Sequence, residues 1–387
     1  MTRNWTLGTP RPPRPASPPR ARGLWLALLV AATAASVAQT GEAPLKLPLG
    51  LPVDLWMRLV PPVNPVTAEK IELGRRLYYD KRLSADGTIA CATCHDPEKG
   101  FADGRKVAEG IGGKPGTRNS PTVLNAVFNE LQFWDGRAAS LEEQAKGPLV
   151  NPIEMGMKDH DAVVAVVQRD ATYATDFSKV FGRAANIDDI VAAIATFERT
   201  VVSGDSAFDR FSAGDPTALS PSAKRGFDLW NGKARCGTCH SIGPLNPNFT
   251  DNKFHNIGVA KGLNLRALSS KAAPPGTTST SLSDAEVSEL GRFVVDRRST
   301  SIGAFRTPGL RDVALTAPYM HDGSKGTLME VVAFYQTGGE LNPYLDAEMK
   351  PVELTGRDMS DLVAFMESLT GEGEGAANRP ALRDSRR

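Results

Sequence analysis

Apolar side chains recur at helical spacing in two similar segments that lie far apart in the chain. One segment follows Thr67 and the other follows Ser220, and both residue types commonly cap helix N-termini. Each segment contains the motif Gly-x-x-Leu-aromatic, at Gly74–Tyr78 and at Gly226–Trp230. The pattern therefore predicts two related helices, each of which opens a similar structural unit.

Each unit also closes with an amphipathic helix, predicted over Ile187–Val202 in the first and over Arg357–Leu369 in the second. The segment Ser203–Thr217 is rich in Gly, Ser and Asp and is expected to hold the boundary between the units. Ala267–Ser281 lacks a hydrophobic period and is predicted to be an exposed loop of the second unit. Strand patterns are few, so we predict a mainly α fold with long loops.

The four cysteines occur only in two Cys-x-x-Cys-His motifs, which follow the opening helices of the two units. This spacing is typical of c-type haem attachment, in which both thiols bond to the haem and the histidine binds its iron. The same order of helix and motif is found in small c-type cytochromes. We therefore predict two covalent haem c groups. The predicted haem-binding residues are Cys91, Cys94, His95, Cys236, Cys239 and His240.

Cys-x-x-Cys pairs also occur in redox dithiols and in zinc sites. Neither alternative accounts for the histidine that follows both pairs. A single zinc site built from all four cysteines would also leave His95 and His240 without a role. Covalent haem is therefore the preferred interpretation.

The N-terminus is typical of a secretory signal peptide. Residues 1–22 contain five arginines and no acidic residue, and the apolar run Leu24–Val37 ends at the small residue Ala38. This run is shorter than the roughly 20 residues of a membrane-spanning helix, so an uncleaved anchor is the less favoured alternative. Haem attachment to such motifs takes place outside the bacterial cytoplasm. The two features together predict a periplasmic protein.

Cleavage after Ala38 would leave 349 of the 387 residues, enough for two domains. That mature chain has 40 Lys and Arg against 44 Asp and Glu, which does not indicate nucleic-acid binding. No segment of it is long and apolar enough to predict a membrane span. The predicted segments are a signal peptide (1–38), an N-terminal domain with the first haem (39–205), a C-terminal cytochrome c domain with the second haem (206–370) and a disordered tail (371–387).

Four further strings lie between and after the haem motifs: Arg118–Asn125, Phe133–Arg137, Leu141–Ala145 and Pro318–Gly323. In this order they resemble the bacterial di-haem cytochrome c peroxidase and MauG family, and the resemblance covers nearly all of the predicted mature chain. It implies two cytochrome c-type domains, each with one covalently bound haem c, that face each other across an interface. It also implies that hydrogen peroxide reacts at one haem and that electrons enter at the other.

Peroxide cleavage needs an open iron position and an acid-base group that moves a proton between the two oxygens. Glu154 lies in a loop flanked by Pro152 and Gly156. An isolated loop glutamate is by default a surface charge. The resemblance implies instead that Glu154 is catalytic, that Gln144 assists it in cleaving the O–O bond, and that Pro148 shapes the same pocket.

The resemblance also assigns roles to residues between the two predicted haems. Trp134 would by default pack in the core, but the family places a tryptophan here as an electron relay. Asn119, Thr316 and Pro318 match a calcium site, the last two through backbone carbonyls. A set of neutral oxygen ligands suits Ca²⁺.

Two departures from the peroxidase pattern concern the iron ligands. Many peroxidases of this family have a histidine after the first haem motif that blocks the oxidised iron until the second haem is reduced. The corresponding stretch here, Glu109–Gly116, contains none, and the next histidine, His160, is expected at a solvated helix start. We therefore expect the iron at His95 to be open without reductive activation.

The second departure is Tyr335, which lies fourteen residues after His321, where peroxidases of the family carry a methionine ligand. Tyrosine is the MauG-like choice, and a phenolate ligand favours ferric or higher iron. The alternative is that Tyr335 packs on a helix while Met320 or Met329 supplies a sulfur ligand. His321 is expected beside the second haem, and His255 receives no role.

The sequence therefore favours a periplasmic di-haem peroxidase. It would reduce hydrogen peroxide at the His95 haem, with electrons delivered through the His240 haem from a small cytochrome c or copper protein. One alternative is a MauG-like enzyme that uses peroxide-derived high-valent iron to oxidise residues of a partner protein. Another is an electron carrier without catalysis, which Glu154 disfavours. A monomer and a homodimer both remain open.

Overall fold

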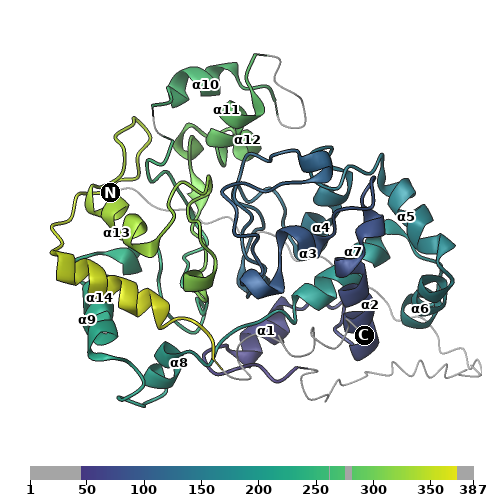
Figure 1. Ribbon diagram of the computed structural model, residues 1–387, viewed down its shortest axis with the longest axis horizontal. Helices are drawn as coiled ribbons and strands as arrows, with labels where there is room; N and C mark the ends of the chain where they lie inside the picture. The colour runs from purple at the N-terminus through teal and green to yellow at the C-terminus, as the bar shows by residue number, and fades with distance from the viewer. Residues whose placement is uncertain (1–44, 261, 275–280, 373–387) are drawn as a thin grey trace, which may run out of the picture. The chain divides into compact units, whose positions relative to one another are not determined.

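The computed structural model describes residues 45–260, 262–274 and 281–372, and this part of the chain is mainly helical (Figure 1). Its one two-stranded sheet pairs β1 (Phe254–His255) antiparallel to β2 (Phe305–Arg306). The predicted signal peptide, 1–38, lies outside the described residues, and so does the predicted tail beyond residue 372. Within the described ranges, we find no helix with the length and hydropathy of a membrane span.

The helices are joined by long loops that contain short 3₁₀ turns. In chain order they are α1 (Val53–Leu59), α2 (Ala68–Tyr79), α3 (Cys91–Cys94), α4 (Leu141–Val150), α5 (His160–Arg169), α6 (Ala171–Phe181), α7 (Ile187–Glu198), α8 (Ala207–Ser212), α9 (Pro221–Asn231), α10 (Leu265–Lys271), α11 (Asp284–Glu289), α12 (Phe293–Asp296), α13 (Leu328–Gln336) and α14 (Gly356–Glu367).

α2 packs against α7, and α9 packs against α14 (Figure 1). A Cβ atom on Gly74 of α2 would lie 1.8 Å from the carbonyl oxygen of Ala193 on α7. A Cβ atom on Gly226 of α9 would lie 2.0 Å from the carbonyl oxygen of Asp361 on α14. Because only glycine lacks this atom, each pair can bring its two backbones into contact.

Both helices that carry these glycines begin at the predicted caps. The side chain of Thr67 accepts a hydrogen bond from the backbone of Lys70, and that of Ser220 accepts one from Ala223. An aromatic pair then closes each crossing: Tyr78 lies against Phe197, with ring centroids 5.1 Å apart, and an equivalent pair follows in α9 and α14. There the centroids of Trp230 and Phe365 are 5.3 Å apart. Each crossing is the centre of its own hydrophobic cluster.

The duplication extends to α4 and α13, which begin at Ser140 and Thr327. Both cap side chains accept a hydrogen bond from a glutamate backbone three residues on. The interval in sequence between Ser140 and Thr327 also separates further pairs of positions that have matching backbone geometry. These pairs are Asn125 and Asp312 (φ 59° and 60°), Phe133 and Met320 (φ 68° and 71°), and the antiparallel bridges Gln132–Ala138 and Tyr319–Lys325.

This constant interval gives an equivalence between positions in the two halves of the chain. Pro148 on α4 corresponds to Tyr335 on α13, and Trp134 corresponds to His321. The equivalence rests on backbone conformation and helix caps, because the side chains at these positions differ. It becomes important when the two candidate sites are compared.

Several predicted boundaries differ from the structure. α7 ends at Glu198, before the predicted Val202, and α14 ends at Glu367. The predicted loop Ala267–Ser281 is wrong over its first residues, which belong to α10. Leu265 and Leu268 on that helix are buried in a small separate hydrophobic cluster. The predicted loop begins after Leu265, so it contained only one of these two leucines and showed no hydrophobic period. Residues 275–280 of that segment lie outside the described ranges.

The predicted boundary segment Ser203–Thr217 also contains a helix, α8. Phe208 on α8 packs into the cluster around α9 and α14, whereas Val201, just before the segment, packs into the cluster around α2 and α7. The hydrophobic contacts therefore change from one cluster to the other close to this point in the chain.

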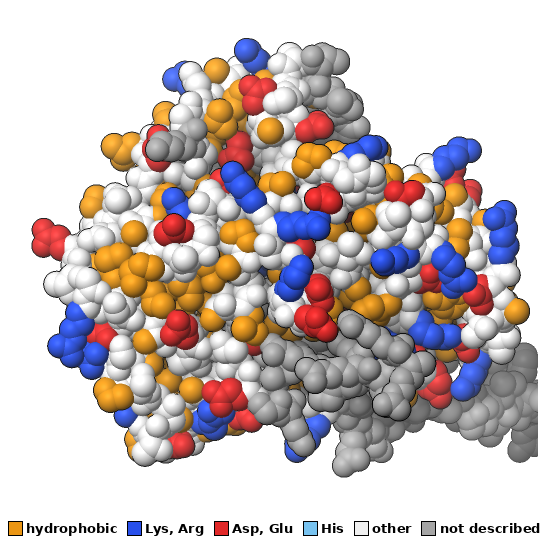
Figure 2. Space-filling model, in the orientation of Figure 1, with side chains coloured by type: hydrophobic (Ala, Val, Ile, Leu, Met, Phe, Trp, Pro, Cys, Tyr) orange, Lys and Arg blue, Asp and Glu red, His pale blue; other side chains and the backbone are white. Residues whose placement is uncertain are grey.

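The surface agrees with the near-neutral charge balance. On the face shown in Figure 2, Lys and Arg side chains are mixed with Asp and Glu side chains over the described residues, and small apolar patches lie between them. Neither sign of charge forms a continuous stripe on that face. A basic footprint of the kind that binds nucleic acid is not seen there.

The glycine crossings can be tested by substitution. We expect Gly74→Ala and Gly226→Ala each to lower the free energy of unfolding by about 1–3 kcal/mol, because the added methyl group meets a backbone oxygen and forces the helices apart. Gly356→Ala is the matched control, since a Cβ atom there meets nothing within 4 Å. Denaturant titration of the haem-loaded protein measures all three. Equal, near-zero effects would contradict the close-crossing explanation.

Candidate functional site

The first site comprises Cys91, Cys94 and His95, on and directly after α3. Burial raises the pKa of both thiols and lowers the pKa of His95. The Nδ1 atom of His95 lies 3.3 Å from the carbonyl oxygen of Phe101. A hydrogen bond donated by Nδ1 leaves Nε2 as a free lone pair on a neutral ring, which is the form that binds a metal.

The second site comprises Cys236, Cys239 and His240 and repeats this arrangement. The Nδ1 atom of His240 lies 2.9 Å from the carbonyl oxygen of Phe249. Burial also lowers the pKa of His240. At both sites the aromatic residue near the end of the preceding helix, α2 or α9, donates a hydrogen bond to the backbone carbonyl of the motif histidine. Tyr78 donates to the His95 carbonyl over 3.2 Å, and Trp230 donates to the His240 carbonyl over 3.4 Å.

Each site thus offers two unpaired thiols and one oriented imidazole. This donor set fits covalent haem c, whose attachment consumes both thiols and whose iron takes the free imidazole nitrogen. Cys91, Cys94 and His95 would hold one haem, and Cys236, Cys239 and His240 would hold the other.

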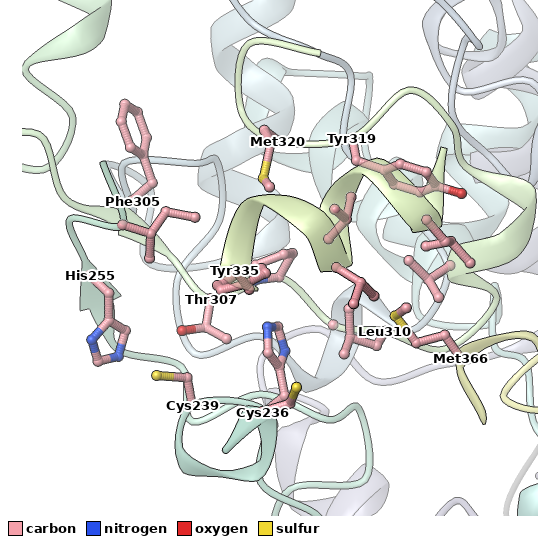
Figure 3. Close-up of a pocket in the computed structure, with 18 of the residues that line it drawn as sticks. Cys236, Cys239, His255, Phe305, Thr307, Leu310, Tyr319, Met320, Tyr335 and Met366 are labelled. Atoms are coloured by element: carbon pink, nitrogen blue, oxygen red, sulfur yellow. The ribbon is translucent and has the colours of Figure 1, made fainter. Parts of the chain in front are cut away.

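A large cavity opens above the second site (Figure 3). Tyr335 on α13 lies in this cavity, and the phenol is close enough to Cys236 and Cys239 for both to raise its pKa, although burial is the main cause. Met320 also lines the cavity, whereas Met329 is exposed to solvent and does not line it. The cavity thus holds Tyr335 and one of the two methionines considered as alternative ligands.

Glu154 lies in the loop after α4 and is held from several directions. Its Oε1 atom accepts a hydrogen bond of 2.8 Å from the side chain of Asn151. Its backbone carbonyl accepts one of 2.9 Å from Ile111. Burial raises the pKa of the Glu154 carboxyl, against the lowering effects of Arg137 and Asn151. A fixed carboxyl that keeps its proton to unusually high pH suits acid-base chemistry.

The stretch Glu109–Gly116, which lacks the blocking histidine, packs directly on this loop. A Cβ atom on Gly110 would lie 1.9 Å from the carbonyl oxygen of Ile153. Glycine here therefore allows the two loops to touch. His160 begins α5, as expected, and its Nε2 atom lies 3.1 Å from the carbonyl oxygen of Lys146.

Gln144 and Pro148 lie on α4, one turn apart, so that their side chains share a face of the helix. The carbonyl oxygen of Pro148 accepts a hydrogen bond of 3.2 Å from Met155, next to Glu154. The end of α4 and the Glu154 loop are thereby joined. The structure brings these three predicted residues into one region, and Glu154 is close enough to Cys91 and Cys94 to raise the pKa of both thiols.

Trp134 lies where the two halves of the chain meet. Its indole donates a hydrogen bond of 2.9 Å to the carbonyl of Asn119, and its own carbonyl accepts one of 2.8 Å from the backbone of Arg306. The backbone of Asn119 in turn donates to the carbonyl of His321 over 2.8 Å. Asn119 and Arg306 are equivalent positions, as are Trp134 and His321. The two contacts are therefore related by the duplication, and Trp134 and His321 both line the cavity of the second site.

His321 is buried, and its ring stacks on Phe305 with centroids 3.6 Å apart. Its Nε2 atom lies 3.1 Å from a carboxylate oxygen of Glu289 on α11. Glu289 was not foreseen from the sequence. It lies in the long insertion between β1 and β2, for which no pattern indicated a contact with the site.

Asn119, Thr316 and Pro318, the predicted calcium ligands, line the same cavity. The side-chain nitrogen of Asn119 donates to the carbonyl of Arg105 over 2.8 Å, which fixes the orientation of its side-chain amide. The structure therefore brings the three residues to one region. Their oxygen-rich character suits Ca²⁺, and calcium binding stays a prediction.

His255, to which the sequence gave no role, lies between two carboxylates beside the second site (Figure 3). Its ring nitrogens lie 3.0 Å from Asp251 and 2.6 Å from Asp346. The hydrogen bond with Asp251 is the first cause that raises the pKa of His255 to about 11, and the Cys239 thiol adds to it. Haem attachment would remove the contribution of that thiol. Asp346 is distant in sequence, so no local pattern could have revealed this cluster.

Comparisons with known proteins agree with these features. A family model described as di-haem cytochrome c peroxidase matches residues 68–217. The methylamine utilization protein MauG of Methylorubrum extorquens is 43% identical over 314 residues, which cover 81% of each chain. The cytochrome c peroxidase Ccp of Escherichia coli is 39% identical over 81% of this chain and 60% of its own. The crystal structure of a MauG-like protein associated with microbial copper homeostasis is 33% identical, with a TM-score of 0.67 over 86% of this chain and 95% of its own.

The two attachment sites can be counted by mass spectrometry of the denatured protein. We expect the intact mass to exceed that of the polypeptide by two haems, because a covalent haem survives denaturation. The variant Cys91→Ala/Cys94→Ala should carry one haem, and Cys236→Ala/Cys239→Ala should carry the other. A wild-type protein that loses all haem on denaturation would contradict covalent attachment.

Proposed function

The chain belongs to the di-haem cytochrome c peroxidase family and is a peroxidase-type oxidoreductase, and on this premise we propose that it reduces hydrogen peroxide at the haem held by His95. Electrons reach that site through the haem held by His240, from a small cytochrome c or copper protein. Each haem belongs to its own cytochrome c-type domain, and the protein acts in the periplasm after export. Bound haem supplies a redox-active iron at each site.

The observation that carries this proposal is the difference between two equivalent positions. α4 and α13 have matching caps and matching preceding turns, and the position of Tyr335 on α13 corresponds to Pro148 on α4. A tyrosine oxygen can bind iron, whereas a proline side chain has no atom that does so. Pro148 therefore leaves the first site accessible to peroxide, while Tyr335 closes the second.

Glu154 provides the proton chemistry beside the accessible site. Reduction of hydrogen peroxide to two water molecules takes up two electrons and two protons. The Glu154 carboxylate accepts the proton of the bound peroxide and returns it to the departing oxygen. Asn151 holds the carboxylate by its Oε1 atom, and Gln144 lies on the adjacent face of α4. Burial of Glu154 places its pKa nearer to neutral pH, where both steps are favourable.

Trp134 lies where an electron relay would be useful. It belongs to the first half of the chain by sequence, yet it lines the cavity of the second site. Its indole and backbone are fixed by hydrogen bonds to Asn119 and Arg306. A rigid aromatic ring in this position shortens the gap that electrons must cross between the sites.

Tyr335 also favours a second candidate function, the oxidation of residues in a partner protein. A phenolate ligand stabilises oxidised iron, so the second site would share oxidising equivalents instead of storing electrons. MauG of Methylorubrum extorquens is among the relatives, and so is a cytochrome c peroxidase. Steady-state turnover separates the two candidates. Brisk turnover of peroxide with a reduced small cytochrome c supports the peroxidase, whereas negligible turnover favours oxidation of a protein partner.

The same assay tests Glu154. We expect Glu154→Gln to lower the rate of reaction with peroxide about 10²–10⁴-fold, because the proton transfer is lost. The wild-type rate should fall as pH is lowered through the pKa of Glu154, which lies above the ordinary value of 4.5, since only the ionised carboxylate accepts the proton. Glu154→Gln should lack this acidic limb. A variant with an unchanged rate and limb would exclude Glu154 as the base.

The ligand difference can be tested by electron paramagnetic resonance of the ferric protein. We expect a high-spin signal from the first site, lost in His95→Gly, and a low-spin signal from the second. Pro148→Met should convert the high-spin signal to low-spin by supplying a ligand at the position equivalent to Tyr335. Tyr335→Met serves as the matched variant and should alter the low-spin signal alone. A purely low-spin wild-type spectrum would contradict an open first site.

A further inference from the structure

Glu198, in the last turn of α7, is a buried acid for which the proposed reaction has no use. Its side chain is 5% exposed, and within the described residues its Oε2 atom has no hydrogen-bond partner. The neighbouring guanidinium of Arg199 lies 2.8 Å from Glu142 on α4 and pairs with it. Burial is the main cause that raises the pKa of Glu198 to about 8, and Glu142 adds to it against the opposing effect of Arg199.

The duplication shows where this acid points. Gly74 contacts Ala193 in the first crossing, and Gly226 contacts Asp361 in the second. The same alignment pairs Phe197 with Phe365, whose Cβ atoms lie next to these glycines. One position further on, Glu198 therefore corresponds to Met366 of α14.

Met366 lines the cavity of the second site (Figure 3). By the equivalence, Glu198 occupies the corresponding place at the first site. The electrostatics agree independently, because Glu198 raises the pKa of the Cys91 thiol and that of the Tyr78 phenol. Tyr78 in turn donates its hydroxyl to the backbone of His95. The carboxyl thus lies within electrostatic range of the Cys91 thiol and of the tyrosine that holds the backbone of His95.

A haem iron gains a positive charge when it is oxidised and loses one when it is reduced. In a buried environment a charge change of this kind interacts strongly with a nearby ionisable group. A methionine at the second site cannot respond by ionisation, whereas a carboxyl at the first site can. The charged groups that act on Glu198 are Arg199, which directly follows α7, and Glu142 on α4. Glu198 in turn acts on Tyr78 of α2 and on Cys91 of α3.

We propose that Glu198 exchanges one proton with solvent in step with the redox state of the haem at His95. When that haem accepts an electron from its donor, the Glu198 carboxylate takes up a proton, and when the haem gives up the electron, the carboxylic acid releases it. Electron uptake at the first site is therefore charge-compensated by Glu198, whereas Met366 provides no ionisable group at the equivalent position of the second site. The inference deepens the proposed function and rests on haem attachment at His95.

The test is a spectroelectrochemical titration of the haem-loaded protein on both sides of pH 8. The signal that His95→Gly removes identifies the first haem. Its midpoint potential should fall with rising pH in the wild type and become independent of pH in Glu198→Gln. Met366→Gln, which changes the equivalent residue at the other site, should leave the slope of the first haem unchanged. A slope in Glu198→Gln equal to that of the wild type would overturn the proposal.

A second variant and a second measurement ensure that misfolding of Glu198→Gln is not mistaken for loss of the coupled proton. Glu198→Met introduces the side chain found at the equivalent position and should show the same flat profile as Glu198→Gln. In the wild type, redox-difference infrared spectra should contain the carbonyl stretch of a protonated carboxyl, and both variants should lack it. Glu154→Gln should retain it. If Glu154→Gln removes the band and the Glu198 variants retain it, Glu154 is the coupled group and the proposal is wrong.

Failure of this inference is distinguishable from failure of the proposed function. A protein with no haem on Cys91 and Cys94 would overturn both. A protein with both haems that turns over peroxide, but whose first haem has a potential independent of pH, would overturn the role of Glu198 alone.

Discussion

The structure depends on two close helix crossings, each made possible by a glycine. At Gly74 and at Gly226 the backbone of one helix touches the carbonyl of another, and a methyl group would not fit. The aromatic residue one turn later then reaches the backbone of the haem-motif histidine. Because each crossing fixes a helix whose aromatic residue binds the histidine backbone, it helps to set the position of the histidine at each site.

The same scaffold is used twice, and the function arises from the positions where the copies differ. Pro148 stands where the other copy has Tyr335, Trp134 stands where it has His321, and Glu198 stands where it has Met366. In the proposed function and inference, these differences set the sixth ligand of the iron, the aromatic relay and a titratable group near the first site. Two equivalent pockets thereby acquire unequal chemistry without a change of fold.

The features predicted from the sequence are those with local causes. The caps at Thr67 and Ser220 depend on neighbouring residues, and both are confirmed. The contacts of His255 with Asp346 and of His321 with Glu289 were missed, because they join segments that are distant in the chain. Glu198 lay within a predicted helix. Alignment of the two closing helices through Phe197 and Phe365 would have shown that the residue equivalent to Glu198 in the second half is a methionine.

The buried Glu198 also has a thermodynamic consequence for the fold. Its carboxyl ionises at about pH 8 in the folded protein and at about 4.5 when exposed in the unfolded chain. The unfolded state therefore loses its proton first, so the stability contributed by the neutral acid is complete below pH 4.5 and is lost as pH rises to about 8. Each pKa unit corresponds to about 1.4 kcal/mol, and a methionine at this position would avoid that loss entirely. An acid whose stabilising contribution is lost as pH rises from 4.5 to about 8, where the equivalent position carries a methionine, is more simply explained by a role at the haem than by packing.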